Sequence, residues 1–134
     1  MKSLVLPALA LSLAACASQS GNMAPTDTPA LEGEWQLTEI AGEAASGTLR
    51  FDTSDNSYSG NAGCNTLFGQ YQSEGASIRL EEPAGTLKGC DAQRMAQEAK
   101  FARNLVQGAS WQQQGQTLEI RDAAGKAVIR AARK

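Results

Sequence analysis

Ser59-Gly-Asn-Ala-Gly-Cys-Asn65 is the stretch that decides how the rest of the chain is interpreted. Its glycines and asparagines are typical of a turn or bulge in which asparagine side chains bond the backbone. Residues that favour strands flank it, which predicts short strands over Tyr58–Gly60 and Thr66–Tyr71. A phosphate-binding loop is the alternative, but the stretch lacks the Lys and Ser/Thr of that motif and opens no helix.

Outward from this stretch, apolar and polar positions alternate as they do in antiparallel strands. Trp35, Leu37 and Glu39, for example, fall on alternate positions of the first run. Gly, Asn, Asp and Ser clusters separate the runs and indicate turns. The predicted strands are Gly33–Ile40, Thr48–Asp52, Tyr58–Gly60, Thr66–Tyr71, Ser77–Leu80, Ser110–Gln114, Thr117–Arg121 and Ala127–Ala131.

After Cys90 the spacing changes to that of a helix. Asp91 is a suitable N-cap, and Gly108 is a suitable residue to end the helix. We expect the apolar, mostly alanine face to approach the sheet closely, with Glu98 at its margin, either bonded to backbone groups or solvated. The residues of that face are Ala92, Met95, Ala96, Ala99, Ala102, Leu105 and Val106.

The N-terminal segment has the features of a bacterial lipoprotein leader. Lys2 precedes an apolar run too short to anchor stably across a bilayer, and the run ends in Leu13-Ala-Ala-Cys16, which resembles a lipobox. We expect residues 1–15 to be a signal peptide and Cys16 to carry the lipid. An ordinary secretory peptide or a buried N-terminal helix is the alternative.

Residues 16–30 are predicted to be the lipidated cysteine and a flexible tether. Ala17–Ala30 contains two prolines and almost no large apolar residue, so it cannot bury enough surface to fold. In many Gram-negative bacteria, an aspartate after the lipidated cysteine retains the protein in the inner membrane, and here that position is Ala17. We therefore expect an outer-membrane anchor with the domain facing the periplasm.

Composition narrows the function classes. The chain has 12 Lys and Arg against 14 Asp and Glu, a formal net charge of −2, and no basic run, so nucleic acid is not an expected partner. It has no histidine, the commonest general base and metal ligand near neutral pH. Glu74, Glu81 and Glu82 could be acid/base or metal-binding carboxylates. Adjacent strand residues point to opposite faces, so Glu81 and Glu82 are poorly placed to share a ligand, and a solvated edge is favoured. We expect no catalytic, cofactor-binding or metal-binding residue.

Cys64 and Cys90 allow three interpretations. A structural disulfide is favoured, because paired thiols are bonded in an oxidising envelope, and closing the loop would stabilise the fold by roughly 3.5 kcal/mol. Two buried free thiols, or a pair of catalytic thiols, are the alternatives. The missing histidine disfavours catalytic thiols, since no imidazole can activate them.

The aromatic side chains are expected to fill the core. Alternatively, they line a cavity for an acyl chain or a small apolar ligand, as a half-open barrel allows. The residues concerned are Trp35, Phe51, Phe68, Tyr71 and Trp111.

Four sequence elements, in this order, resemble the META domain, also called the HslJ-like domain. They are Leu31-Glu-Gly-Glu-Trp-Gln-Leu37; Ser59–Asn65 with Phe68-Gly-Gln-Tyr71; Thr86-Leu-Lys-Gly-Cys90 followed by Glu98 and Phe101; and Gly115-Gln-Thr-Leu118. The resemblance covers residues 31–134. It implies an α+β fold, a small curled antiparallel sheet that is partly open and barrel-like, with one helix packed across it. It implies no particular chemistry.

Together these features predict a non-enzymatic envelope lipoprotein, held at the membrane by its lipid anchor. It would bind a protein, a lipid or other apolar ligand, or a cell-wall component, in envelope maintenance or in stress or drug tolerance. The alternative is a small periplasmic enzyme, either a hydrolase or a thiol oxidoreductase. Titrating thiols in the denatured protein without reductant separates the two, because reactive thiols besides Cys16 would favour the enzyme.

Overall fold

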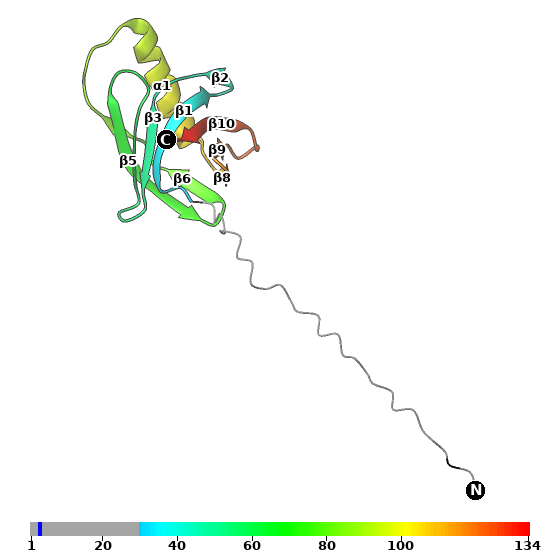
Figure 1. Ribbon diagram of the computed structural model, residues 1–134. Coiled ribbons are helices and arrows are strands. Elements are labelled where there is room, and N and C mark those ends of the chain that lie inside the picture. Colours follow the sequence, from blue (N-terminus) through cyan, green and yellow to red (C-terminus); the bar gives the residue numbers. More distant parts are fainter. Residues whose placement is uncertain (1–2, 4–29) are drawn as a thin grey trace.

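The computed structural model of the chain describes Ser3 and residues 30–134 (Figure 1). The predicted signal peptide, Cys16 and nearly all of the tether lie outside the described residues. In the described part, no helix is long and apolar enough to cross a membrane. The elements are β1 (Gly33–Ile40), β2 (Glu43–Ala44), β3 (Thr48–Asp52), β4 (Ser57–Asn61), β5 (Thr66–Glu74), β6 (Ser77–Leu80), β7 (Ala84–Gly85), α1 (Ala92–Val106), β8 (Ser110–Gln114), β9 (Thr117–Arg121) and β10 (Ala127–Arg133).

The eight longer strands form a closed antiparallel barrel in the order β10-β9-β8-β6-β5-β4-β3-β1, and pairing of β1 with β10 closes the ring. Full closure removes the unpaired strand edges that promote aggregation. The predicted α+β class with a curled antiparallel sheet is therefore confirmed, and the barrel is closed where the resemblance implied a partly open one. The weakest part of the ring is the seam between β6 and β8, where Ser77 and Ser110 form the one ladder pair.

The strand alternation puts one apolar set inside the barrel, as strand geometry requires. The largest fully buried side chains are Trp35, Tyr58, Tyr71, Phe51, Phe101, Leu37, Ile40, Leu49, Leu105, Leu118, Ile120 and Ile129. The predicted alternation fails at Glu39, because the pairing of β1 with β10 shifts register after Leu37. Such an irregularity reverses the faces, so Ile40 points inward and Glu39 pairs with Arg130 at 3.0 Å.

Two aromatic residues differ from the predicted core set. Phe68 is 48% exposed, since β5 directs Leu67 and Tyr71 inward and places Phe68 on the outer face. Trp111 is only partly buried, although it packs against the core. Phe51 and Tyr71 do belong to the core, where their rings meet edge to face with centroids 5.1 Å apart.

Helix α1 packs across one end of the barrel (Figure 1). Asp91 caps it as predicted, by accepting a hydrogen bond from the Arg94 backbone N–H at 2.9 Å. The predicted apolar face is right at Leu105 and in part at Ala102, but the other buried residues of the helix are Phe101 and Asn104. The remaining predicted residues are exposed, namely Ala92, Met95, Ala96, Ala99 and Val106. Burial stabilises in proportion to apolar area, so the large side chains decide which face turns inward.

Gly108 has a different role from the helix-ending one that the sequence predicts. The helix ends at Val106, and Gly108 does not adopt the positive φ that a glycine C-cap supplies. A Cβ at Gly108 would instead lie 2.8 Å from Cγ2 of Ile120. Gly108 is therefore required for close packing against β9.

The first and last residues of the domain are fastened to each other. The Arg133 guanidinium lies 3.8 Å from the centre of the Trp35 ring and donates to the carbonyl oxygens of Ala30 and Glu32. Trp35 Nε1 donates to the Leu31 carbonyl at 2.9 Å. These contacts fix the place where the chain enters the barrel, at the lower end in Figure 1.

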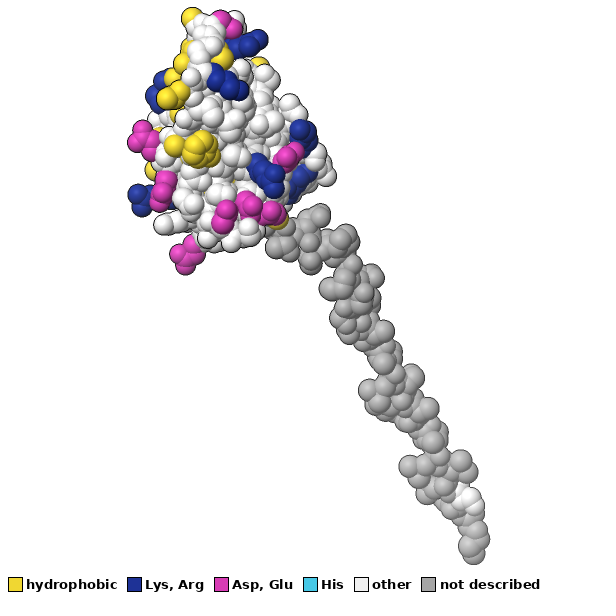
Figure 2. All heavy atoms as spheres, turned by 90° about the vertical axis from the view of Figure 1, so that its left-hand side faces the viewer, with side chains coloured by type: hydrophobic (Ala, Val, Ile, Leu, Met, Phe, Trp, Pro, Cys, Tyr) yellow, Lys and Arg dark blue, Asp and Glu magenta, His cyan; other side chains and the backbone are white. Residues whose placement is uncertain are grey.

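The face shown in Figure 2 carries scattered hydrophobic side chains toward its upper end and acidic side chains toward its lower end. The large exposed hydrophobic residues of the described part are Phe68, Leu87, Met95 and Val106. Leu87 is fully exposed at the tip of the connection between β7 and α1.

Candidate functional site

The connection between β4 and β5 is the turn that the sequence predicts. Gly63 has a φ of +117°, which L side chains rarely adopt. Asn61 stabilises this turn through both ends of its amide: Oδ1 accepts from the Gly63 N–H at 2.8 Å, and Nδ2 donates to the Cys64 carbonyl at 3.3 Å. The turn needs no phosphate or other ligand to satisfy Asn61.

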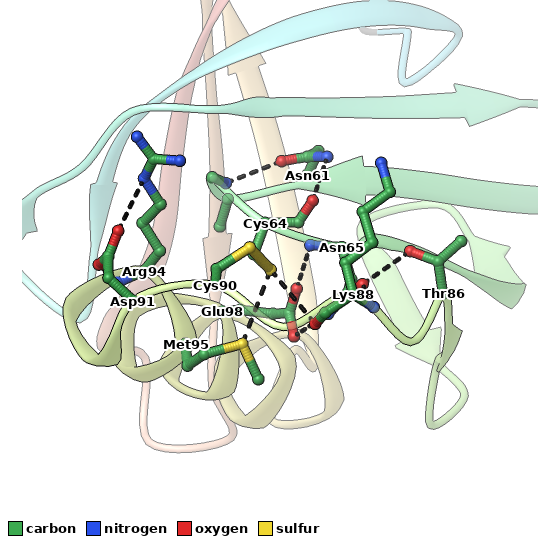
Figure 3. The surroundings of a disulfide bond; sticks show 12 residues. Asn61, Cys64, Asn65, Thr86, Lys88, Cys90, Asp91, Arg94, Met95 and Glu98 are labelled. Atoms are coloured by element: carbon green, nitrogen blue, oxygen red, sulfur yellow. Dashed lines mark hydrogen bonds and ion pairs between the residues drawn. A yellow bond between two sulfur atoms is a disulfide. The ribbon is translucent and has the colours of Figure 1, made fainter.

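Cys64 follows this turn and forms a disulfide with Cys90, with 6.1 Å between their Cα atoms (Figure 3). Cys90 immediately precedes Asp91, the N-cap of α1, so the bond ties the start of the helix to the barrel wall. Met95 adds a sulfur contact from the first turns of the helix, with its Sδ 3.6 Å from Cys64 Sγ. Of the three interpretations of these cysteines, the structure contains the disulfide.

Asn65 is the centre of a hydrogen-bond network beside the disulfide and is only 4% exposed. Its Oδ1 accepts from the Lys88 backbone N–H at 2.6 Å and from the Thr86 hydroxyl at 2.9 Å. Its Nδ2 donates to the Lys88 carbonyl and to Glu98, both at 3.2 Å. One side chain thus holds the connection between β7 and α1 onto the barrel.

Glu98, on α1, completes the cluster around the disulfide. We call this cluster of Cys64, Cys90, Asn65 and Glu98 the disulfide corner. Its Oε1 accepts the Asn65 backbone N–H at 2.5 Å, while Oε2 accepts from the Asn65 amide (Figure 3). This is the backbone-bonded role, one of the two that its place on the helix predicts. The carboxylate is therefore directed at a neighbouring backbone group, so it is poorly placed to exchange protons with a substrate.

A second set of contacts joins α1 to β2 and to the connections that precede β3 and β5. Gln97 Nε2 donates to the carbonyls of Ala62 and Ser46, and Lys100 pairs with Glu43 at 2.5 Å. The hydrogen bond and charge of Lys100 lower the pKa of the Glu43 carboxyl. These contacts fasten α1 to the loops at its end of the barrel.

The other carboxylates named by the sequence do not gather into a site. Glu74, Glu81 and Glu82 are all exposed. The Glu81 backbone carbonyl accepts a hydrogen bond from the Tyr58 hydroxyl at 2.5 Å, which is a structural role. Among the described residues, no cluster of three or more His, Cys, Asp or Glu side chains could hold a metal ion.

Five clefts in the described part of the chain have volumes from about 210 to 460 Å³. None of these five is lined by Trp35, Phe51 or Tyr71, which pack inside the barrel instead. Trp111 is the exception among the predicted aromatics, because it lines the cleft of about 460 Å³.

The sequence profile of the META domain matches residues 28–134. The chain belongs to the META-domain family. The predicted resemblance is therefore confirmed, and the disulfide corner described above lies within the matched META domain. Comparison with curated protein sequences gave no match.

Two solved structures resemble this META domain in fold. One is a DUF4847 family protein from Bacteroides vulgatus, with a TM-score of 0.60, 12% identity, and coverage of 78% of this chain and 94% of that chain. The other is a protein from Burkholderia xenovorans determined by NMR, with a TM-score of 0.62, 19% identity, and coverage of 78% and 83%. At these identities the likeness establishes the fold alone.

Sequence reasoning missed two parts of the site. It did not anticipate Gln97, because a glutamine on a helix gives no signal of its carbonyl partners. It also favoured a core position for Trp111 and kept lining a cavity only as the alternative shared by all five aromatics. The run Trp-Gln-Gln-Gln at 111–114 was the available signal, since a strand with so many amides beside one aromatic is not an ordinary core strand.

Proposed function

We propose that the protein is an envelope lipoprotein whose META domain is a non-enzymatic binding module. The observation that carries this proposal is the Cys64–Cys90 disulfide. Disulfides persist in oxidising compartments such as the bacterial periplasm and are rare in the cytosol. A signal peptide over residues 1–15 would provide the export that this compartment requires.

The chemistry of the disulfide corner supports binding rather than catalysis. The polar groups of Asn65 and Glu98 bond one another and the backbone around them. A bonded disulfide offers no thiolate nucleophile. This corner therefore acts as a rigid support, and recognition belongs to the clefts on the outer surface.

The proposed anchor is the set of acyl chains on Cys16, because more than one chain is needed for stable attachment to a membrane. Ala17 gives no inner-membrane retention signal, so we place the domain at the outer membrane, facing the periplasm.

Fatty-acid labelling tests the anchor. Labelled fatty acid should enter the wild-type protein and the Cys64→Ser/Cys90→Ser double variant, but not Cys16→Ser. The double variant is the matched control, because it removes two cysteines and keeps Cys16. Equal labelling of wild type and Cys16→Ser would refute the lipoprotein proposal.

Separating membranes by density tests the location. The wild type should be recovered with the outer membrane, and Ala17→Asp should move it to the inner membrane. Recovery of the wild type with the inner membrane would contradict the proposed sorting.

A further inference from the structure

Strand β8 extends past the hairpin that joins β5 to β6, and this leaves a cleft in the barrel wall. The two elements meet at Ser77 and Ser110, and the Trp111 backbone N–H donates to the Ala76 carbonyl at 2.9 Å. Beyond this contact lies a cleft of about 460 Å³, within the range of about 300–1,000 Å³ usual for small-molecule sites. Its described lining residues are Gly75, Ala76, Trp111, Gln112, Gln113 and Gln114.

Trp111 gives this cleft a fixed aromatic surface. Its indole Nε1 donates to the Gly75 carbonyl at 3.0 Å, which holds the ring against the hairpin. The side chain is partly buried against the core and partly open to the cleft. The other tryptophan, Trp35, is fully buried, so Trp111 is the tryptophan that a ligand can reach. An aromatic ring held in place loses little conformational freedom when it binds.

The lining points to one chemical class of ligand. All six described lining residues are uncharged, so an ionic ligand would lose hydration without gaining an opposite charge. Glutamine amides both donate and accept hydrogen bonds, which suits hydroxyl and acetamide groups. The Gln113 amide is already bonded to Ala30 and Gly115, so Gln112 and Gln114 are the glutamines that can meet a ligand. The face of an aromatic ring carries partial negative charge and attracts C–H groups. A sugar ring presents C–H groups on its faces and polar groups around its rim.

We propose that this cleft binds a saccharide chain of the cell wall through one uncharged sugar ring, which stacks on Trp111. The proposal rests on the proposed function, because an envelope domain facing the periplasm meets the glycan strands of the wall. The cleft lies where the chain enters the domain, since the Ala30 N–H donates to Gln113 Oε1 at 3.2 Å. An anchored protein would therefore hold the glycan close to its own point of attachment.

Fluorescence of the full-length protein in phosphatidylcholine vesicles tests the contact. The probe is the water-soluble hexamer of β-1,4-linked N-acetylglucosamine. Trp111 should report binding as a saturable blue shift, while the buried Trp35 should not respond. Absence of any shift, together with absence of heat in calorimetry, would overturn the saccharide site.

Variants measured by calorimetry with the same hexamer identify the surface. Trp111→Ala should weaken binding at least about tenfold, whereas Phe68→Ala, the matched exposed aromatic on β5, should leave it unchanged. If Trp111→Ala fails to fold, Gln114→Ala replaces it, because Gln114 is exposed at the end of β8 and its loss should weaken binding severalfold. Unchanged affinity in a folded Trp111→Ala or Gln114→Ala variant contradicts the proposal.

Two further outcomes separate the possible errors. Quenching of Trp111 by vesicle lipids with brominated acyl chains, without a response to the hexamer, would assign the cleft to a lipid chain and reject the saccharide. Labelling of Cys16 without hexamer binding rejects this inference and leaves the proposed envelope function standing. Hexamer binding without Cys16 labelling rejects the envelope function, and with it the cell wall as the source of the ligand.

Discussion

Gly60 lies on β4 beneath the helix, where its missing side chain lets Phe101 enter the end of the barrel. A Cβ at Gly60 would lie 2.8 Å from two carbons of the Phe101 ring and 2.9 Å from the Thr48 carbonyl oxygen. Both neighbours are constrained, because Phe101 is fully buried and Thr48 belongs to the paired strand β3. The glycine therefore sets how closely helix and barrel pack.

Gly60→Ala should lower the free energy of unfolding by about 1–3 kcal/mol, as overpacking of a filled core does. Gly89→Ala is the matched control, since a Cβ there meets nothing within 4 Å. The control should be neutral or stabilising by up to about 1 kcal/mol, because alanine restricts the unfolded chain. Urea unfolding measures both variants, and equal losses would show that close helix packing is not the cause.

The environment of Tyr58 predicts that the free energy of unfolding falls at alkaline pH. Burial raises the pKa of its hydroxyl to about 12, and the charges of Glu81 and Glu82 add to the effect. In the unfolded chain the pKa is about 10, so Tyr58 contributes its full stability below that pH. The contribution falls as pH rises from about 10 to about 12, because the unfolded state loses the proton first.

Tyr58→Phe should therefore flatten the decline in unfolding free energy over this pH window. At pH 8 the variant should lose about 0.5–1.5 kcal/mol, the value of one hydrogen bond, which here joins the Tyr58 hydroxyl to the Glu81 carbonyl. Thermal unfolding from pH 8 to pH 12 measures both the alkaline slope and the loss of stability at pH 8. An unchanged alkaline slope would assign the decline to other groups.

At the scale of elements, the disulfide joins α1 to the β4–β5 connection across a sequence separation of 26 residues. Cys64→Ser and Cys90→Ser should each lower the free energy of unfolding by roughly 3.5 kcal/mol on the chain-entropy model. The double variant should lose little more than either single variant, because the same bond is missing in all three. Urea unfolding without reductant measures this, and additive losses would indicate two independent contributions.

The longer strands could be predicted because apolar residues alternate with polar ones where one face of a strand is buried and the other is exposed. Strand β2, Glu43–Ala44, and strand β7, Ala84–Gly85, were missed, since two residues are too few to show any period. The buried face of α1 was predicted only in part, at Leu105 and Ala102, because alanine recurs on several sides of the helix. Phe68 was misassigned because β5 continues its alternation through Gly69, and a glycine carries no apolar signal.

The candidate site was predictable only in part. The sequence indicated Cys64, Cys90 and Glu98, because a cysteine pair and a carboxylate on an apolar helix face are unusual. The partners of Asn65 at Lys88 are backbone groups, which any residue could supply, so no residue type marked them. The cleft at Trp111 depends on how far β8 extends past a hairpin, and this is a property of register that one sequence does not reveal.

At the scale of the whole molecule, the number of backbone pairs between neighbouring strands differs around the barrel. Strand β10 has a partner on each side, and it pairs with β1 from Trp35 with Arg133 to Ile40 with Ile129. Strands β6 and β8 share one ladder pair, and the Ile78 and Trp111 backbone N–H groups donate across this seam. Local opening needs least free energy where the fewest bonds must break.

Hydrogen exchange should therefore begin at the seam. The Ile78 and Trp111 amides should exchange at least about tenfold faster than those of Ile129 and Ala131 in the middle of β10, because opening the seam breaks few bonds and leaves the rest of the sheet paired. NMR of amide exchange under native conditions measures the four rates. Equal rates would mean that the barrel opens only as one cooperative unit. Faster exchange at the seam would mean that the wall beside Trp111 opens while the disulfide corner at the helix end remains closed.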